Sequence, residues 1–466
     1  MKRLSIYPMA FILAASLLLG SCKLGKQYTR PNVDLPATLD RMNFDSTSVA
    51  DVAWENLYQD TTLQRLIRKT LEYNKDMQIA AARIKELAAM KRVDFANLFP
   101  KFGTATYGEK EGLNEGGDSY SNSNKFYMKA SVSWELDLWG NLRWAKDKSM
   151  ADFLGSIENQ RALKMSLIAQ MAQSYFELVA LDNELSIVKQ TVEARREGLN
   201  LTRIRYEGGM TNETPFRQAQ VELARTTTLI PDLEKKISIK ENEIAFLMGE
   251  YPSQIRRTSL PEDVLLPTAL PMGLPSGLLE RRPDVRQAEQ ALIAANASVG
   301  MAFTNLFPRL SLTASAGSES KELENVLKSP YHLLSGSLIT PVFNMGKNRA
   351  MVKAKKAAYE GAVHAYEKAV LNAFKDARNA IIEFNKSREV YETRLRLEQA
   401  SKITLDLVKL QYINGVIAYL DLLDAQRGYL DAQIGLSNSI RDKQITMVHL
   451  YKALGGGWQE TKQEKK

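Results

Sequence analysis

Cysteine and histidine are nearly absent from this chain of 466 residues. It has one cysteine, Cys22, and three histidines, which lie far apart at positions 332, 364 and 449. A single cysteine excludes a disulfide within the chain. The sequence also contains no phosphate-binding loop, glycine-rich dinucleotide turn or metal-ligand spacing. We therefore expect a protein that is not an enzyme, with no catalytic residue, no metal site and no cofactor.

Long apolar runs are also missing beyond the N-terminus. No later segment approaches the roughly 18 to 20 consecutive apolar residues that a membrane-spanning helix needs, so this chain could cross a membrane only with strands. The net charge of +8 is spread along predicted helices. That spread favours solvated helix faces over a nucleic-acid surface, and we expect no nucleic acid partner.

The N-terminus predicts a lipoprotein signal peptide over residues 1–21. A charged start precedes the apolar run FILAASLLLG (11–20), which is too short to span a membrane. The next residues complete LGSC, which resembles the bacterial lipobox, where the peptide is cut before the cysteine and lipid is attached to it. The mature protein would then begin at Cys22, outside the cytoplasm, and its acyl chains would anchor it.

Proline has an uneven distribution that marks the organisation of the chain. No proline falls between Pro100 and Pro215 and none follows Pro341, whereas six crowd into residues 252–283. This composition predicts a Pro-rich linker and equatorial region at 249–280.

The segments on either side of this linker are two copies of one unit. NLFP at 97–100 recurs at 305–308, 208 positions later, and RYEGG at 205–209 corresponds to QYING at 411–415, 206 positions later. A repeat of this kind indicates one structural unit used twice. Each copy is expected to contain a helix, a β-hairpin, a long helix, a tight turn and a returning helix.

The repeat also predicts where each part begins and ends. The expected parts are an N-terminal lipidated segment and equatorial region at 22–57, repeat 1 at 58–248, repeat 2 at 281–454 and a polar C-terminal tail at 455–466. The β-hairpins are expected at about 101–138 and about 309–343. The helical hairpins should turn at Gly208-Gly209 and Asn414-Gly415, residues that tolerate positive φ.

Alternation of apolar and polar residues predicts membrane strands in both hairpins. In FYMKASVSWELDL (126–138) the even positions are apolar and the odd positions are mostly polar, and RLSLTASAGS (309–318) repeats the pattern. This period places one strand face in an apolar medium and the other in water, at lengths that suit a transmembrane strand. The alternative is a half-buried sheet on a soluble core.

Four strands are too few to close a barrel by themselves. Open strand edges cannot lie in hydrocarbon, because each unpaired backbone group there costs several kcal/mol. The chain is therefore expected to pool its strands with other copies of itself. Pro100 and Pro308 would then be helix-strand corners, ending their helices where these meet the membrane.

Several long motifs, in the same order, resemble the outer membrane factor family, the TolC and NodT-type efflux lipoproteins. They are YTRP (28–31), WENLYQDTTLQRLI (54–67), GLPSGLLERRPDVRQAEQAL (273–292), the two NLFP corners and YLDLLDAQRGYLDAQ (419–433). The resemblance implies an α+β membrane protein, a homotrimer in which four strands per chain close a transmembrane β-barrel joined to a long periplasmic α-helical barrel. It would be anchored by lipid in the cell outer membrane and would extend into the periplasm.

The resemblance also implies a function and partners. The chain would be the outer-membrane exit duct of a tripartite efflux system, passively conducting small molecules such as drugs or metal ions. It would dock on a periplasmic adaptor, a membrane fusion protein, and on an inner-membrane transporter of the RND type. A duct for type I protein secretion and a structural periplasmic lipoprotein stay open as alternatives.

In this family the helix tips close the periplasmic end, and acidic residues surround the aperture. The matching positions are Asp421 and Asp424, with Tyr412 before the second turn. The resemblance therefore implies a periplasmic gate at these residues, which would attract cations. An acidic helix start that favours the helix dipole is the simpler interpretation, and both can hold.

Two features of the sequence depart from the family pattern. Some members carry an arginine shortly after the second turn, where this chain has Ile417, which puts a salt-bridge latch at that position in doubt. In the first repeat the equivalents of the acidic positions are Pro215 and Gln218. An acidic ring would therefore come from the second repeat alone.

Overall fold

A computed structural model of the chain describes residues 23–33, 49–114, 116–117, 120–257, 277–341 and 343–458. The predicted signal peptide, Cys22, much of the Pro-rich linker and most of the C-terminal tail lie outside the described residues. Within the described part of the chain, every helix is either too short or too polar to span a bilayer.

The chain divides into two compact units, and each draws on both repeats. Unit 1 comprises Met1–Val33, Ala82–Ile157 and Arg286–Lys368, and unit 2 comprises Asp34–Ala81, Glu158–Val285 and Ala369–Lys466. The strands of the described residues all lie in unit 1, whereas both helical turns lie in unit 2.

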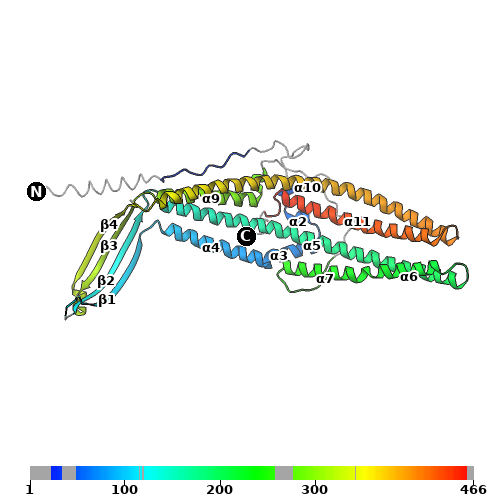
Figure 1. Cartoon of the computed structure of the whole chain (residues 1–466), viewed down its shortest axis with the longest axis horizontal. Helices are drawn as coiled ribbons and strands as arrows, with labels where there is room; N and C mark the ends of the chain where they lie inside the picture. The colour runs from blue at the N-terminus through cyan, green and yellow to red at the C-terminus, as the bar shows by residue number, and fades with distance from the viewer. Residues whose placement is uncertain are drawn as a thin grey trace. The chain divides into compact units, whose positions relative to one another are not determined.

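Unit 1 contains one antiparallel sheet that joins the hairpins of the two repeats (Figure 1). Its strands are β1 (Lys101–Leu113), β2 (Ser121–Leu136), β3 (Arg309–Ser320) and β4 (Pro330–Ile339), in the order β1-β2-β3-β4. A short 3₁₀ helix, η2 (Leu323–Lys328), connects β3 to β4. The hairpins of the two repeats therefore pair through β2 and β3, and β1 and β4 are the outer strands.

The strand register keeps the two sheet faces distinct. Lys101 pairs with Ser133, Phe126 with Ser320 and Arg309 with Ile339. Each pair joins residues of equal parity, so even positions of all four strands share one face and odd positions share the other. The predicted alternation thus becomes a sheet with a largely apolar face and a largely polar face.

The polar face is held by contacts across β2, β3 and β4. Lys129 forms an ion pair with Glu319, and its Nζ lies 3.6 Å from the ring centroid of Tyr331. Gly317 separates these side chains, because it pairs with Lys129 on one side and with Tyr331 on the other. A Cβ at Gly317 would lie 2.0 Å from the Met128 carbonyl oxygen, so this close backbone approach requires glycine.

The two repeats have matching helices. The helices before the strands are α4 (Lys75–Ala96) and α9 (Pro283–Thr304), each of 22 residues. The helices after them are α5 (Asn141–Glu207) and α10 (Lys347–Ile413), each of 67 residues and about 100 Å long. The prediction of a tandem repeat with two long helical hairpins and four strands is confirmed.

The two predicted corner prolines each stand directly before a strand. Pro100 precedes β1, and Pro308 precedes β3. Indole groups contact both corners: Trp134 Nε1 donates to the Leu98 carbonyl oxygen at 3.0 Å, and Trp139 Nε1 donates to the Pro308 carbonyl oxygen at 2.8 Å. A tryptophan side chain therefore donates a hydrogen bond to each corner. Both tryptophans belong to repeat 1, one in β2 and the other just after it.

The returning helices differ between the repeats. Repeat 2 has a single helix, α11 (Tyr419–Ala453), whereas repeat 1 has α6 (Thr214–Thr227) and α7 (Leu229–Leu247). Pro231 lies in the first turn of α7, and a proline clashes with the carbonyl group four residues earlier, here that of Thr227. The break at Thr228 is therefore a local consequence of sequence.

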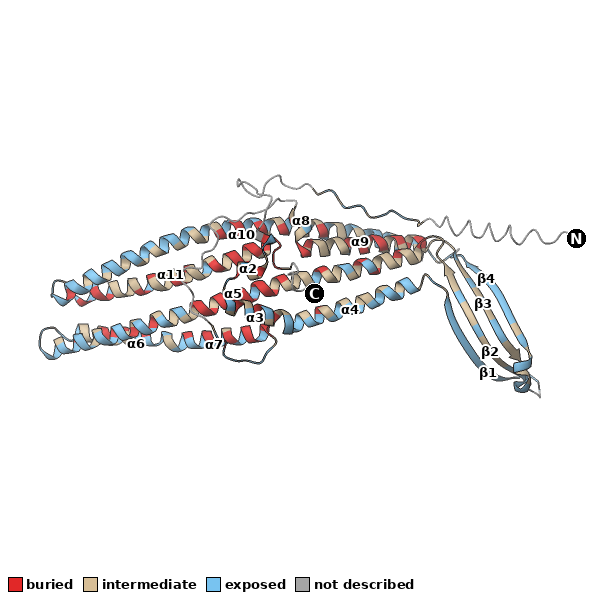
Figure 2. Cartoon of the chain, turned by 180° about the vertical axis from the view of Figure 1, so that it is seen from behind, coloured by how far each residue is buried: buried red, intermediate tan, exposed pale blue. Residues whose placement is uncertain are grey.

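Short elements and buried side chains form the core of unit 2 (Figure 2). They include the 3₁₀ helix η1 (Val49–Asp51), α2 (Trp54–Leu57), α3 (Thr61–Tyr73) and α8 (Gly277–Arg281), which pack near the middle of α5 and α10 and near the C-terminal end of α11. Asp60 caps α3 by accepting from the Thr62 amide at 2.7 Å, and it also accepts from the Tyr175 hydroxyl at 2.6 Å.

Two arginines bind the segments on either side of the Pro-rich linker to the long helices. Arg282 is buried and donates to the carbonyl oxygens of Ala373, on α10, at 3.3 Å and of Ala453, on α11, at 3.2 Å. Arg257 donates to Asp182, on α5, at 2.8 Å and also pairs with Glu241, on α7. The arginine of the ERRPDV motif at position 282 thus joins helices of repeat 2, a structural contact.

Candidate functional site

The predicted site lies at the turns of the two helical hairpins, which end in the same backbone motif. Gly209 has φ of 69° and Gly415 has φ of 74°. The residue after each glycine donates its amide back into the last helical turn: Met210 to Arg205 at 2.8 Å, and Val416 to the carbonyl oxygen of Gln411 at 2.9 Å. This is the glycine-dependent end of a helix.

The other two predicted turn residues act differently. Gly208 and Asn414 have no positive φ, and each continues the helix by donating its amide to the residue four positions earlier. Asn414 Nδ2 also donates to the Leu410 carbonyl oxygen at 2.9 Å. In each predicted pair, therefore, only the second residue, Gly209 or Gly415, needs a positive φ.

A small apolar cluster lies behind the second turn. Tyr412 is buried there, and its ring centroid lies 5.6 Å from that of Tyr419. The cluster consists of Ala219, Tyr412, Tyr419, Leu422 and Leu423, with Leu199, Leu405, Val408 and Ile417 packed against it. Burial raises the pKa of Tyr419 to about 12. Ile417 thus contributes apolar packing at the position where a latch arginine was in doubt.

Arg205 connects the first helical hairpin to the second. It donates to the carbonyl oxygens of Tyr412 at 3.3 Å and Ile413 at 2.9 Å. Its guanidinium also lies 4.7 Å from the centre of the Tyr412 ring, a cation–π geometry. Tyr412 is therefore held from above its ring and at its backbone by one side chain from repeat 1.

The two predicted acidic residues lie on the first turns of α11. Asp421 Oδ2 accepts from the Ala418 amide at 3.1 Å, a hydrogen bond that caps the helix start. Asp424 is 67% exposed and lies 3.4 Å from Arg427 Nη1. Asp421 thus has a structural contact, whereas Asp424 has one weak, exposed partner.

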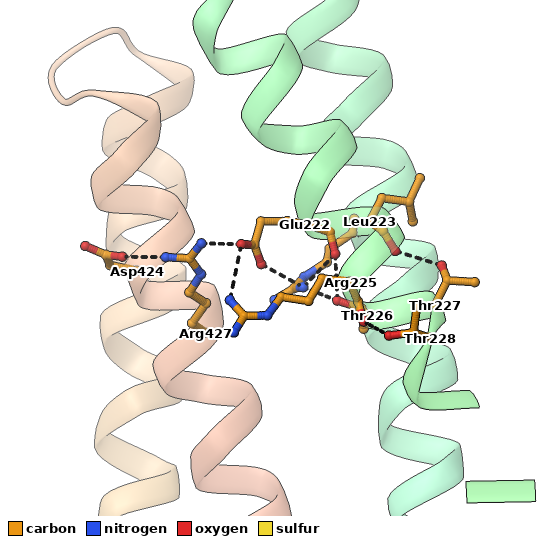
Figure 3. A network of polar contacts seen from close by, with 9 residues as sticks. Glu222, Leu223, Arg225, Thr226, Thr227, Thr228, Asp424 and Arg427 are labelled. Atoms are coloured by element: carbon orange, nitrogen blue, oxygen red, sulfur yellow. Dashed lines mark hydrogen bonds and ion pairs between the residues drawn. The ribbon is translucent and has the colours of Figure 1, made fainter. Parts of the chain in front are cut away.

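A buried ionic network lies next to Asp424 (Figure 3). Glu222, on α6, has a side chain that is 5% exposed, and Arg195, on α5, is 6% exposed. Arg195 Nη1 donates to Glu222 Oε2 at 3.1 Å and also to Thr226. Arg427, on α11, pairs with the same carboxylate. Glu222 therefore joins α5 and α6 of the first hairpin to α11 of the second.

The network favours the ionised form of Glu222. The hydrogen bond from Arg427, and the charges of Arg427 and Arg195, lower the pKa of Glu222 against the opposing effect of burial. The stabilisation is complete above the ordinary glutamate pKa of about 4.3. It is lost as pH falls through the lower pKa of Glu222 in the folded state. The ion pairs of Glu222 with Arg195 and Arg427 therefore persist at neutral pH.

Sequence reasoning missed the residues of this network. Glu222 corresponds to Gly428 in repeat 2, and Arg427 corresponds to Val221 in repeat 1. At each of these two positions one repeat has a charged residue and the other has an uncharged one. This difference between the repeats is the sequence signal that could have indicated Glu222 and Arg427. Their mutual contact, 205 positions apart, is visible in the structure.

Comparison with known proteins identifies the same family that the repeats and the fold indicate. The sequence matches the family described as Outer membrane efflux protein at residues 66–250 and again at 274–456. The Cation efflux system protein CusC of Escherichia coli is 28% identical over 451 residues, covering 96% of this chain and 98% of that protein. The Probable outer membrane lipoprotein SilC of Salmonella typhimurium is 27% identical over 450 residues, covering 95% and 97%.

A solved structure has the same architecture over nearly the whole chain. The outer-membrane channel OprN superposes with a TM-score of 0.87 and 28% sequence identity, covering 94% of this chain and 100% of that one. Two family matches in one chain agree with the tandem repeat. The chain belongs to the outer membrane efflux protein family, and it is a channel of the outer membrane and not an enzyme.

Proposed function

We propose that three copies of this chain form the exit duct of a tripartite efflux system. The observation that carries the proposal is the sheet of four strands, which has distinct faces and leaves β1 and β4 as outer strands. Three copies would supply twelve strands and pair every edge, as a membrane requires. The apolar face would then contact lipid and the polar face would line the lumen.

The hairpin tips are the proposed periplasmic gate. Tyr412, Asp421 and Asp424 lie beside the second turn, and three copies would place six of these carboxylates around one opening. Arg205 and the Glu222–Arg427 pair would hold the two hairpins of each chain together. They would serve in place of a latch at Ile417, and their release would let the tips separate.

The duct would be passive and would depend on partners for energy. A periplasmic adaptor of the membrane fusion type and an RND-type inner-membrane transporter would deliver small molecules to the tips. Metal ions are the favoured cargo over drugs, because exposed carboxylates attract cations and a relative is described as a cation efflux protein. Lipid on Cys22 would add an anchor, and a relative described as a lipoprotein supports it.

The gate predicts a change in ion selectivity. Replacing Asp421 and Asp424 together with asparagine should lower the ratio of cation to anion permeability by about three- to tenfold, because six carboxylates would leave the opening. Reversal potentials of single channels in planar bilayers under a salt gradient measure this ratio.

The matched control removes one acid from the same helix far from the tip. Asp442→Asn lies about 30 Å along α11 from Asp421 and should leave the ratio unchanged. Equal ratios for the double variant and the unmodified channel would place selectivity elsewhere and reject these residues as the gate ring.

A further inference from the structure

The polar face of the sheet changes in side-chain size from one end to the other. Over the middle of β2 and β3 it carries small hydroxyl residues, namely Ser131, Ser133, Ser311, Thr313 and Ser315. Larger side chains replace them towards the strand ends that lie away from the helices. We call this second set the tyrosine belt, and it consists of Tyr107, Tyr127, Lys129, Glu319 and Tyr331.

The rings and the lysine of the tyrosine belt form one continuous ladder across the sheet. Tyr107 on β1 stacks on Tyr127 on β2, with ring centroids 5.2 Å apart and an interplanar angle of 23°. Lys129 Nζ lies 4.4 Å from the Tyr127 centroid and 3.6 Å from the Tyr331 centroid on β4. Because Gly317 on β3 has no side chain, it leaves room for Lys129 to reach Tyr331.

The ladder already holds one ammonium group, that of Lys129. A cation over the face of a tyrosine ring is attracted by the ring quadrupole, and aromatic cages bind quaternary ammonium ions in this way. Lys129 lies between two such rings, and Glu319 supplies the opposite charge. The Lys129 side chain is only 15% exposed. This part of the sheet is therefore suited to an ammonium ion, and the chain fills it with its own lysine.

Tyr107 offers a second ring at the edge of the ladder. It stacks on Tyr127, and 42% of it is exposed. Glu109 and Glu111 follow on the same face of β1 and are also exposed. Closure of a barrel pairs the backbone of β1 and leaves the side chains of this face directed into the lumen. An exposed ring beside carboxylates is an arrangement that attracts an organic cation.

We propose that the tyrosine belt is a binding zone for organic ammonium ions near the outer end of the duct, with Tyr107 and Glu109 as its contact residues. This inference rests on the proposed trimer, in which three copies would bring three belts to one level of the lumen. The large side chains there would bring a passing solute close to the rings. The site adds organic cations to the metal ions proposed above, because cation–π attraction is largest for an ion that has lost its water.

Block of single-channel current by tetraethylammonium tests the site. The many charged residues of α5 and α10 keep the helices in the compartment that receives the protein, so the probe is added to the opposite one. Tyr107→Leu removes the ring but keeps an apolar side chain, and it should raise the concentration for half block at least about fivefold. Tyr107→Phe keeps the ring and should change that concentration by about twofold at most.

Two further variants separate charge and size from the ring. Glu109→Gln removes the charge beside Tyr107 and should raise the concentration for half block about two- to threefold. Leu333→Ala is the control on the same sheet face, because Leu333 lies on β4 two residues from Tyr331 and is 43% exposed. It removes apolar bulk without removing a ring, and the block should stay as in the unmodified channel.

The outcomes separate this inference from the proposed duct. Equal block of Tyr107→Leu and unmodified channels would overturn the inference, and so would equally strong block by benzenesulfonate, since the zone would then bind aromatic solutes of either charge. If Tyr107→Leu forms no channels, Glu109→Gln decides, and unchanged block in that variant would likewise overturn it. Absence of channels in the unmodified chain would instead reject the proposed duct.

Discussion

Replacing Glu222 with alanine is expected to loosen the hairpin tips strongly. The change leaves Arg195 buried without its carboxylate and removes the buried partner of Arg427, which keeps only its exposed contact with Asp424. Breaking a buried ion pair on one side costs about 3 to 5 kcal/mol. Amide hydrogen exchange along α6 should therefore become at least about a hundredfold faster, and the mean conductance of single channels should rise because the hairpins lose one of their connections.

The control is an exposed pair on the same hairpin. Glu213 and Arg217 form a surface ion pair, and Glu213→Ala should change the exchange rate by about twofold at most. Glu222→Gln should fall between the two, because it can accept hydrogen bonds but has no charge. Exchange in Glu222→Ala that matches the unmodified chain would show that the network does not hold the tips.

Gly317→Ala is expected to prevent the sheet from forming in a membrane. The added Cβ would lie 2.0 Å from the Met128 carbonyl oxygen and 2.8 Å from Lys129 Cα, both backbone atoms of β2. Neither atom can move without separating β2 from β3, where the two repeats join, at a cost of about 3 kcal/mol or more. Protease protection of the strands in liposomes should fall about tenfold relative to the unmodified chain.

Gly103→Ala is the matched control on the same sheet face. Its Cβ would meet only the Ser131 hydroxyl oxygen, at 3.9 Å, an ordinary contact. It should leave the strands protected. Circular dichroism of the helices should be equal in both variants, which would locate the defect in the sheet. Full protection of Gly317→Ala would contradict the register of β2 and β3.

Local sequence patterns predicted most of the fold, because helices and strands each follow a short period of apolar residues. Alternation in 126–138 identified the apolar face of β2, and NLFP located both corners next to β1 and β3. The break at Thr228 also had a local cause in Pro231, although the sequence analysis expected one returning helix in each repeat. The α4–α9 and α5–α10 correspondences hold over every residue.

The candidate site could be predicted only in part, because its main contacts join distant segments. Family resemblance indicated Tyr412, Asp421 and Asp424, which lie together beside the second turn. It gave no reason to connect Glu222 with Arg427, since burial of a carboxylate between two hairpins depends on how they pack. The capping role of Asp421 was local and could be expected from a helix start.

The mass of the detergent-extracted mature protein is the most direct test of the central claim that several chains close one lipidated duct. Native mass spectrometry resolves both the number of chains and the acyl groups on each. The account predicts three chains, each beginning at Cys22 with covalent lipid. A monomer that stays soluble without detergent would contradict it and return the chain to the structural-lipoprotein interpretation.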